Sequence, residues 1–181
     1  MSAVPPPSRA PQDPSASPAA DADLRTERLV LRPWSDGDLA AVLDGTRRPH
    51  WAPDFPAEGD RVIAGFTAKT PAARGVHGQR QILERDGGLV VGAIGLFWPP
   101  AEGSVTFGYG IVPSRRGRGY ASEAARALVA FALTAPGVHT VCADIERGNP
   151  ASGRVLEKAG LERWRSDATH VYFRLTAPTG A

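Results

Sequence analysis

The chain has little sulfur and few aromatic rings: one cysteine and one methionine among 181 residues, with Phe, Trp and Tyr making up 7%. One cysteine cannot form a disulfide within the chain, which excludes a disulfide-rich secreted scaffold and fits a reducing compartment. The longest apolar stretch, Leu89 to Trp98, has ten residues, whereas a membrane-spanning helix needs roughly twenty. The N-terminal segment also lacks the basic and apolar regions of a signal peptide. These absences predict a cytoplasmic protein with no membrane partner.

The sequence has neither a strong net charge nor a metal-binding pattern. Its 21 basic and 19 acidic residues give a formal charge of +2, and the basic residues are scattered except at 115–118. We therefore expect no nucleic-acid partner. The four histidines, at 50, 77, 139 and 170, lie far apart with no ligand spacing, so we expect no metal site. Cys142 lies in an apolar run, which favours a buried small residue over a nucleophile.

The length and composition predict one globular domain. A chain of 181 residues with 42% hydrophobic residues can bury a proper core but has no room for a second domain. Residues 1–23 are rich in Pro, Ala and Ser, and we expect them to form a disordered tail. The domain is predicted to span residues 24–176, followed by a flexible C-terminus over residues 177–181.

A short run rich in arginine and glycine, Pro113 to Ala121, follows the strand-like segment 105–112 and precedes a helix. Gly117 and Gly119 allow a tight turn in which several N–H groups converge on the positive end of the helix dipole. The arginines at 115, 116 and 118 add positive side chains. This arrangement predicts a pocket for a diphosphate, against the alternative of a solvated basic turn. Neither the Rossmann pattern nor the P-loop pattern is present.

The remaining pattern predicts alternating strands and helices. Apolar residues recur with helical spacing at 121, 124, 125, 128, 129 and 132, and Pro136-Gly137 ends that helix. Ser35 is expected to begin one helix, Arg61 to Lys69 to form another, and Asn149-Pro150 to begin a third that Gly160 ends. Strands are expected at 29–31, on both sides of Asp86-Gly-Gly88, and at 89–98, 105–112, 138–145, 161–165 and 170–175. Gly108 and Gly110 suggest a bulge or a close backbone approach.

The run Arg116 to Ala121 fits the R/Q-x-x-G-x-G/A signature of the GNAT superfamily of N-acetyltransferases. The segments FGYGIVPSRRGRGYASEAARALVAFA and NPASGRVLEKAGL extend the match, and from about Leu24 to Thr176 the chain resembles one such domain. These two segments resemble the branch related to ribosomal-protein N-terminal acetyltransferases. The resemblance implies an α/β fold with a mixed, mostly antiparallel central sheet, whose splayed fourth and fifth strands hold the cofactor and which is flanked by helices.

The resemblance also implies a site for acetyl-CoA as co-substrate, with no metal. The pyrophosphate would lie on Arg116, Gly117, Arg118, Gly119, Tyr120 and Ala121. The backbone of Ile111 and Val112 would pair with the pantetheine arm, and amides near Ile111 would stabilise the oxyanion. By the same resemblance, Asn149 contacts the cofactor and Ser152 is the partner of the departing thiolate. For Ser152 the alternative is a second helix cap.

The residue that would take the proton of the acceptor amine in many relatives is absent from this chain. Many relatives have a glutamate two residues before the Gly-Tyr pair, where this chain has Thr106. Asp144 and Glu146 lie on one face of the next strand and are the candidate catalytic substitutes, acting directly or through water. His50 and His170 are weaker candidates, and Glu123 is expected to serve the structure.

The loop 47–60 is dense in proline and aromatic residues. Rigid rings form a shaped wall at a small entropic cost, so Trp51, Asp54 and Phe55 are the candidate acceptor contacts; the alternative is that the two rings fill the core. We expect an N-acetyltransferase that moves an acetyl group directly to a primary amine of a small molecule or peptide N-terminus, as a monomer or homodimer. The alternative function is a catalytically weak acyl-CoA-binding sensor or scaffold.

Overall fold

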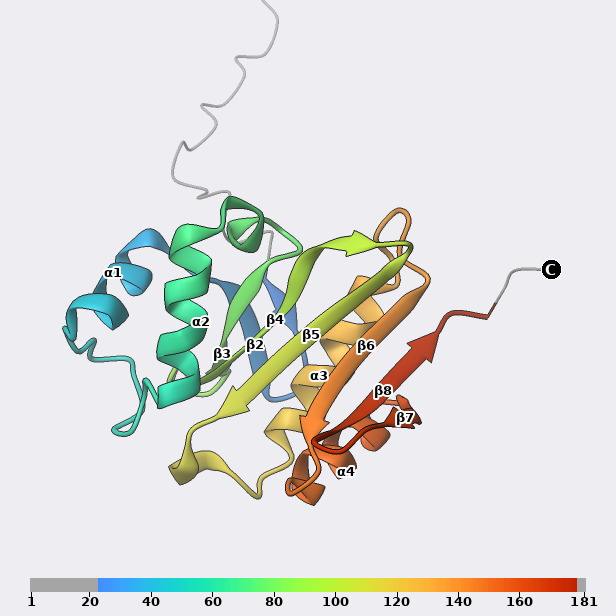
Figure 1. The fold of residues 1–181 in the computed structure, drawn as a ribbon. Helices are drawn as coiled ribbons and strands as arrows, with labels where there is room; N and C mark the ends of the chain where they lie inside the picture. The colour runs from blue at the N-terminus through green and yellow to red at the C-terminus, as the bar shows by residue number, and fades with distance from the viewer. Residues whose placement is uncertain (1–22, 179–181) are drawn as a thin grey trace, which may run out of the picture.

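The computed structural model describes residues 23–178, and these form one eight-stranded sheet with helices on both faces (Figure 1). Helices α1 and α2 cover one face near β2 to β4, and α3 and α4 lie on the other. The strands are β1 (Leu24–Arg25), β2 (Leu29–Pro33), β3 (Gln79–Glu84), β4 (Val90–Ala101), β5 (Ser104–Ile111), β6 (Thr140–Glu146), β7 (Glu162–Ser166) and β8 (His170–Thr176). The helices are α1 (Asp36–Asp44), α2 (Glu58–Lys69), α3 (Tyr120–Ala132) and α4 (Pro150–Lys158), with short 3-10 turns η2 (Pro71–Arg74) and η3 (Pro113–Arg115).

The strand order is β1-β2-β3-β4-β5-β6-β8-β7, and β5 with β6 is the parallel pair in an otherwise antiparallel sheet. That pair is short: Ser104 to Thr106 face Thr140 to Cys142, and no pairing follows. Beyond Thr106 the two strands diverge, so β5 presents an unpaired edge. The predicted mostly antiparallel sheet with two splayed strands is therefore confirmed.

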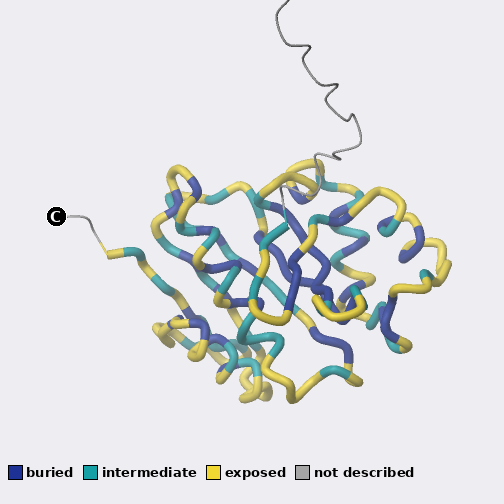
Figure 2. The backbone as a smooth tube through the Cα atoms, turned by 180° about the vertical axis from the view of Figure 1, so that it is seen from behind, coloured by how far each residue is buried: buried dark blue, intermediate teal, exposed yellow. Residues whose placement is uncertain are grey.

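The core lies on both faces of the sheet, because α1 and α2 bury residues on one face and α3 on the other, and Figure 2 shows buried strands at the centre. One part of the core lies where the sheet meets α3. The predicted apolar stripe of α3 packs there, and Ala124, Ala125, Leu128, Val129 and Ala132 are all buried. Burying one leucine or valine side chain contributes about 1.5–3 kcal/mol. This packing fixes the N-terminal end of α3 beside the diverging strands.

The predicted caps of α1 and α4 are confirmed. The side chain of Ser35 accepts from the Asp38 amide at the start of α1, and the side chain of Asn149 accepts from the Ser152 amide at the start of α4. Gly160 has φ +94 just after α4, in the left-handed region that glycine tolerates. The short strand β1 was not predicted, because two residues are too few for a periodic pattern.

The predicted bulge at Gly108 and Gly110 is wrong. Pairing with β4 is regular there, and the irregularity in that ladder lies between Phe97 and Ala101. A close backbone approach does occur at Gly110, but the residue that must be glycine there is Gly92, because a Cβ on Gly92 would lie 2.1 Å from the Gly110 carbonyl oxygen. A Cβ on Gly110 itself would meet nothing within 4 Å.

Residues 1–22 and 179–181, which hold most of the predicted tail and C-terminus, lie outside the described residues. Within residues 23–178 no helix is long and apolar enough to cross a membrane. The same residues contain no cluster of His, Cys, Asp or Glu suited to a metal ion.

Candidate active site

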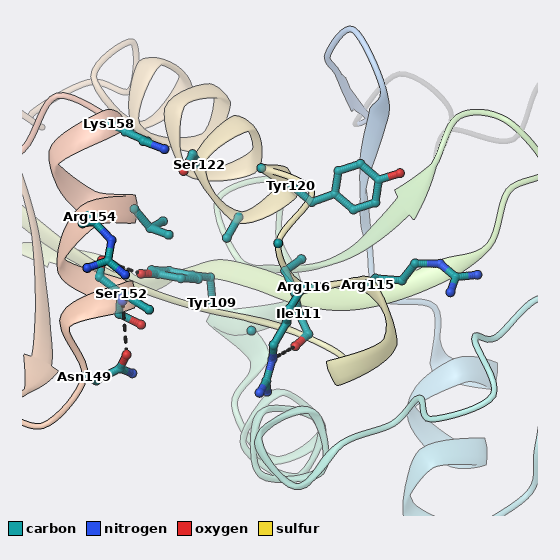
Figure 3. Close-up of a pocket in the computed structure, with 16 residues that line it drawn as sticks. Tyr109, Ile111, Arg115, Arg116, Tyr120, Ser122, Asn149, Ser152, Arg154 and Lys158 are labelled. Atoms are coloured by element: carbon teal, nitrogen blue, oxygen red, sulfur yellow. Dashed lines mark hydrogen bonds between the residues drawn. The ribbon is translucent and has the colours of Figure 1, made fainter.

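A cavity of about 510 Å³, called here the first cavity, opens where β5 leaves β6 and the N-terminal ends of α3 and α4 converge (Figure 3). It is lined by Tyr109, Gly110, Ile111, Arg115, Arg116, Gly117, Gly119, Tyr120, Ala121, Ser122, Asn149, Ala151, Ser152, Arg154, Val155 and Lys158. Of the predicted cofactor residues, Val112 and Arg118 do not line it. The structure brings the others together with Ser152.

The arginine-glycine loop, residues 113–119, shapes one end of this cavity. Gly117 and Gly119 have φ values of +74 and +80, where an L side chain would be strained. Gly119 is the N-cap of α3, and no side chain caps that helix. The first amides of a helix have no partner within it. Those of α3 therefore face the cavity beside Tyr120 and Ala121, at the positive end of the helix dipole.

Side chains from distant strands hold this loop in place. The Glu84 carboxylate accepts from Arg115 Nε and from the Tyr120 hydroxyl, both at 3.1 Å. The Arg28 guanidinium donates to the Arg118 carbonyl oxygen at 2.9 Å and lies 5.0 Å from the centre of the Tyr120 ring. The loop is thereby fastened to β3 and to the turn before β2.

Glu123, one turn into α3, is the other anchor. Its carboxylate accepts from the Thr26 hydroxyl, the Arg28 amide and the Arg28 guanidinium at 2.6–2.8 Å. Burial raises the pKa of Glu123, but these hydrogen bonds and the positive charge outweigh it and hold the pKa below its ordinary value. The structural role expected for Glu123 matches these contacts.

The unpaired edge of β5 offers backbone groups to a ligand. The Val112 amide donates to the Val91 carbonyl, and the Val112 carbonyl accepts from the Arg115 amide. Val112 therefore has no backbone group left for the pantetheine pairing expected of it. Because backbone groups alternate in direction along a strand, the N–H groups of Tyr109 and Ile111 point the opposite way, toward the gap. The Ile111 carbonyl accepts from Arg116 Nε at 2.9 Å (Figure 3).

Tyr109 spans the gap from β5 to α4, and the sequence interpretation missed it. Its hydroxyl donates to the Ser152 carbonyl oxygen at 3.2 Å (Figure 3). Burial raises the pKa of Tyr109, so the phenol stays protonated at neutral pH. Asn149 caps α4 with its side chain, and the Ser152 hydroxyl makes no hydrogen bond to any residue from 23 to 178. The alternation of buried residues at 105 and 107 could have placed Tyr109 on this face.

The cavity is positively charged on two sides. Arg115 and Arg116 come from the arginine-glycine loop, and Arg154 and Lys158 from α4. Helical spacing puts the latter two one turn apart on the face that meets the cavity. The sequence interpretation passed over them because each is an ordinary surface residue until the fold brings α4 beside the loop.

The predicted acceptor contacts do not line the first cavity. Trp51 and Phe55 are 3% and 1% exposed and their rings pack edge to face, 5.2 Å apart. In this structure they are core residues, as in the alternative interpretation. Asp54 instead accepts from the amide and hydroxyl of Ser114, and this hydroxyl bond lowers the pKa of Asp54. It thus holds the start of the arginine-glycine loop.

The predicted bases lie outside the first cavity as well. Thr106 is opposite Cys142 in the last pair before the strands diverge. Asp144 and Glu146 follow Cys142 at two-residue spacing, so all share the sheet face of Thr106. Both acids are exposed, and Asp144 Oδ2 lies 4.0 Å from Nε2 of His170. His50 lies elsewhere, with its Nε2 3.6 Å from Asp38.

Comparisons with known proteins agree with this geometry. Residues 28–162 match the family model described as acetyltransferase (GNAT) domain. The chain is 26% identical over 141 residues to YnaD of Bacillus subtilis (strain 168), an uncharacterised N-acetyltransferase; the match covers 77% of this chain and 82% of YnaD.

Two solved structures have a similar fold. A GNAT-family acetyltransferase from Bacillus anthracis has a TM-score of 0.64 and 23% identity, with 85% of this chain and 98% of that one covered. The aminoglycoside acetyltransferase AAC(6')-Ib, in complex with coenzyme A and kanamycin, has a TM-score of 0.58 and 20% identity, with 82% and 94% covered. The family match spans most of the chain, and the chain belongs to the GNAT acetyltransferase family.

Proposed function

We propose that this acyltransferase moves the acetyl group of acetyl-CoA directly to a primary amine of a small molecule or a peptide N-terminus. The observation that supports this best is the first cavity itself. It joins an uncapped helix start behind two left-handed glycines to an unpaired strand edge. A diphosphate followed by an amide-bearing arm fits such a combination.

The residues present suit coenzyme A in charge and in hydrogen bonding. The amides from Gly117 to Ala121 would take the pyrophosphate, and Arg154 and Lys158 would add positive charge for the remaining phosphate. The N–H groups of Tyr109 and Ile111 would pair with the pantetheine arm or stabilise the oxyanion. Arg116 would hold the Ile111 carbonyl, and through it the strand edge, while its charge faces the same cavity.

Acetyl transfer needs a neutral amine and a proton for the thiolate. The amine nitrogen forms a bond to the thioester carbon and loses a proton, the C–S bond breaks, and the sulfur gains a proton. Two hydroxyl groups of this chain are candidates for supplying that proton. Ser152 is the one predicted from the sequence, and Tyr109 is the one that the geometry adds, as a protonated phenol at the gap. Loss of turnover in Tyr109→Phe but not in Ser152→Ala would assign the role to Tyr109.

Because Thr106 cannot accept the proton of the acceptor amine, deprotonation must rely on solvent, on a distant acid or on the low pKa of the amine itself. Asp144 and Glu146 remain proposed bases, acting through water. An α-amino group with a pKa near 8 is roughly one tenth neutral at pH 7, and a lysine-like amine near 10.4 is neutral in under about one part in a thousand. We therefore infer a preference for peptide N-termini, aminosugars or aryl amines over lysine-like amines.

The test is thiol release from acetyl-CoA with a panel of amines, measured across pH. The proposal predicts turnover with low-pKa amines and a rate that keeps rising toward alkaline pH. A rate that levels off below about pH 7 would show an efficient protein base, to be sought by substituting Asp144 and Glu146. Tight acetyl-CoA binding without turnover on any amine would favour the sensor or scaffold function that the missing carboxylate at Thr106 suggests.

A further inference from the structure

A second cavity, of about 470 Å³, lies on the α1 side of the sheet, between β1, β2, β3 and the turn that follows β3. It shares no lining residue with the first cavity. Its volume is in the range of small-molecule sites. Neither the acetyl transfer nor the acetyl-CoA site uses it.

A buried amide lines this cavity without a hydrogen-bond partner. Gln81 is 1% exposed, and its Nε2 has no partner among residues 23–178. Gln79, two residues earlier on the same face of β3, is equally buried, and its Nε2 donates to the Leu96 carbonyl at 2.9 Å. A buried N–H group without a partner is costly and uncommon. The Gln81 Nε2–H is therefore available as a donor to a molecule that enters the cavity.

The cavity also offers a cation with unused donors. Asp23 accepts from the Arg32 guanidinium at 3.0 and 3.3 Å. The Arg25 Nη2 lies 3.9 Å from Oδ2 of the same carboxylate, which is too far for a hydrogen bond. The Arg25 side chain is 62% exposed. The neighbouring pair of Arg32 and Asp23 shows how a guanidinium of this cluster holds a carboxylate. Arg85 adds positive charge, and its Nη1 donates to the carbonyls of Thr26 and Glu27.

The two acids of the lining are already engaged. The Glu84 carboxylate accepts from Arg115 and Tyr120. Asp38 accepts from the Ser35 hydroxyl at 2.7 Å, and its other oxygen lies 3.6 Å from His50 Nε2. With Arg32 paired to Asp23 and Glu84 paired to Arg115, the two positive charges of Arg25 and Arg85 exceed the one negative charge of Asp38. A guanidinium with free donors and an amide N–H match a planar carboxylate group.

We propose that the second cavity is a binding site for a small carboxylate, held by the Arg25 guanidinium and the Gln81 amide. The carboxylate would take one or two N–H groups from Arg25 at the mouth and the Gln81 Nε2–H inside. This site is separate from acetyl transfer, and the proposal does not depend on the function proposed above.

The test is calorimetric titration of the full chain with succinate, and with succinamide as a neutral probe of the same size. We expect saturable binding of succinate alone, weakened by about tenfold or more in Arg25→Ala and Gln81→Leu, since a hydrogen bond to a charged group is lost in each. Arg154→Ala, an arginine of the first cavity, is the matched control and should bind succinate unchanged.

Three results would overturn the proposal: no saturable binding of succinate, equal binding of succinamide, or a loss of binding in Arg154→Ala in place of Arg25→Ala. Arg25 is largely exposed, so its substitution leaves the fold intact and the test valid even if Gln81→Leu does not fold.

Discussion

Replacing Asp60 by asparagine should stabilise the protein at neutral pH. Asp60 lies in the first turn of α2, is 4% exposed, and accepts from the Ala57 amide at 2.9 Å. Burial raises its pKa from 3.8 to about 6. The folded protein therefore holds this proton more tightly than the unfolded chain does, and stability falls as pH rises from about 4 through 6. A rise of about 2 in the pKa of Asp60 corresponds to a loss of at most about 3 kcal/mol in the free energy of unfolding at high pH.

Urea denaturation from pH 4 to pH 8 measures this effect. Asp60→Asn keeps an acceptor for the Ala57 amide, so we expect it to be more stable than the wild type by about 1–3 kcal/mol at pH 8, with the difference vanishing near pH 4. Glu58→Gln, in the same turn but exposed, is the control and should change little at any pH. A difference for Asp60→Asn that does not vary with pH, or a loss of stability at pH 8, would refute this reasoning.

Two further predictions concern the arginine-glycine loop and its anchor. Gly119→Val should weaken acetyl-CoA binding by more than about tenfold, because a branched side chain at φ +80 distorts the amides that face the phosphates. Gly45→Val, at φ +82 with open space around it, should cost similar stability and leave acetyl-CoA binding unchanged in the same titration; equal loss in both variants would count against the loop. Glu123→Ala should lower the free energy of unfolding at pH 7 by about 2–3 kcal/mol. Because the pKa of Glu123 is lowered, its contribution to stability is present above its ordinary pKa and is lost as the pH falls through the lowered one. The difference between the wild type and the variant should therefore shrink on acidification; a constant difference would contradict this.

The fold and the loop could be predicted because their signals are local. Glycine spacing, helix periodicity and the Asn149 cap are properties of short segments, and the family pattern covers most of the domain. The ends of the strands were predicted less accurately. For example, β4 continues through Pro99 and Pro100 to Ala101, where proline would ordinarily end a strand.

The rest of the site depends on contacts between distant segments. No local pattern links Tyr109 to Ser152, since the two meet only after β5 and α4 pack together. Trp51 and Phe55 were candidate contacts of the acceptor, but both are buried in the core. Aromatic residues in a proline-rich loop suit a pocket wall and a core equally well, and only their burial in the folded protein distinguishes the two roles. Asp54 was predicted to contact the acceptor, but its carboxylate accepts a hydrogen bond from the hydroxyl of Ser114, sixty residues later in the chain.

The measurement that tests the central claim most directly compares two acetyl donors on the wild-type protein with one low-pKa amine. Acetyl-CoA and S-acetylpantetheine have the same reactive thioester, but only the former has the phosphates that the helix start and the basic side chains should hold. If the first cavity binds the donor as proposed, the KM for acetyl-CoA will be at least about tenfold lower than that for S-acetylpantetheine, because charge-assisted hydrogen bonds to the phosphates are lost. Equal KM values for the two donors would contradict the account.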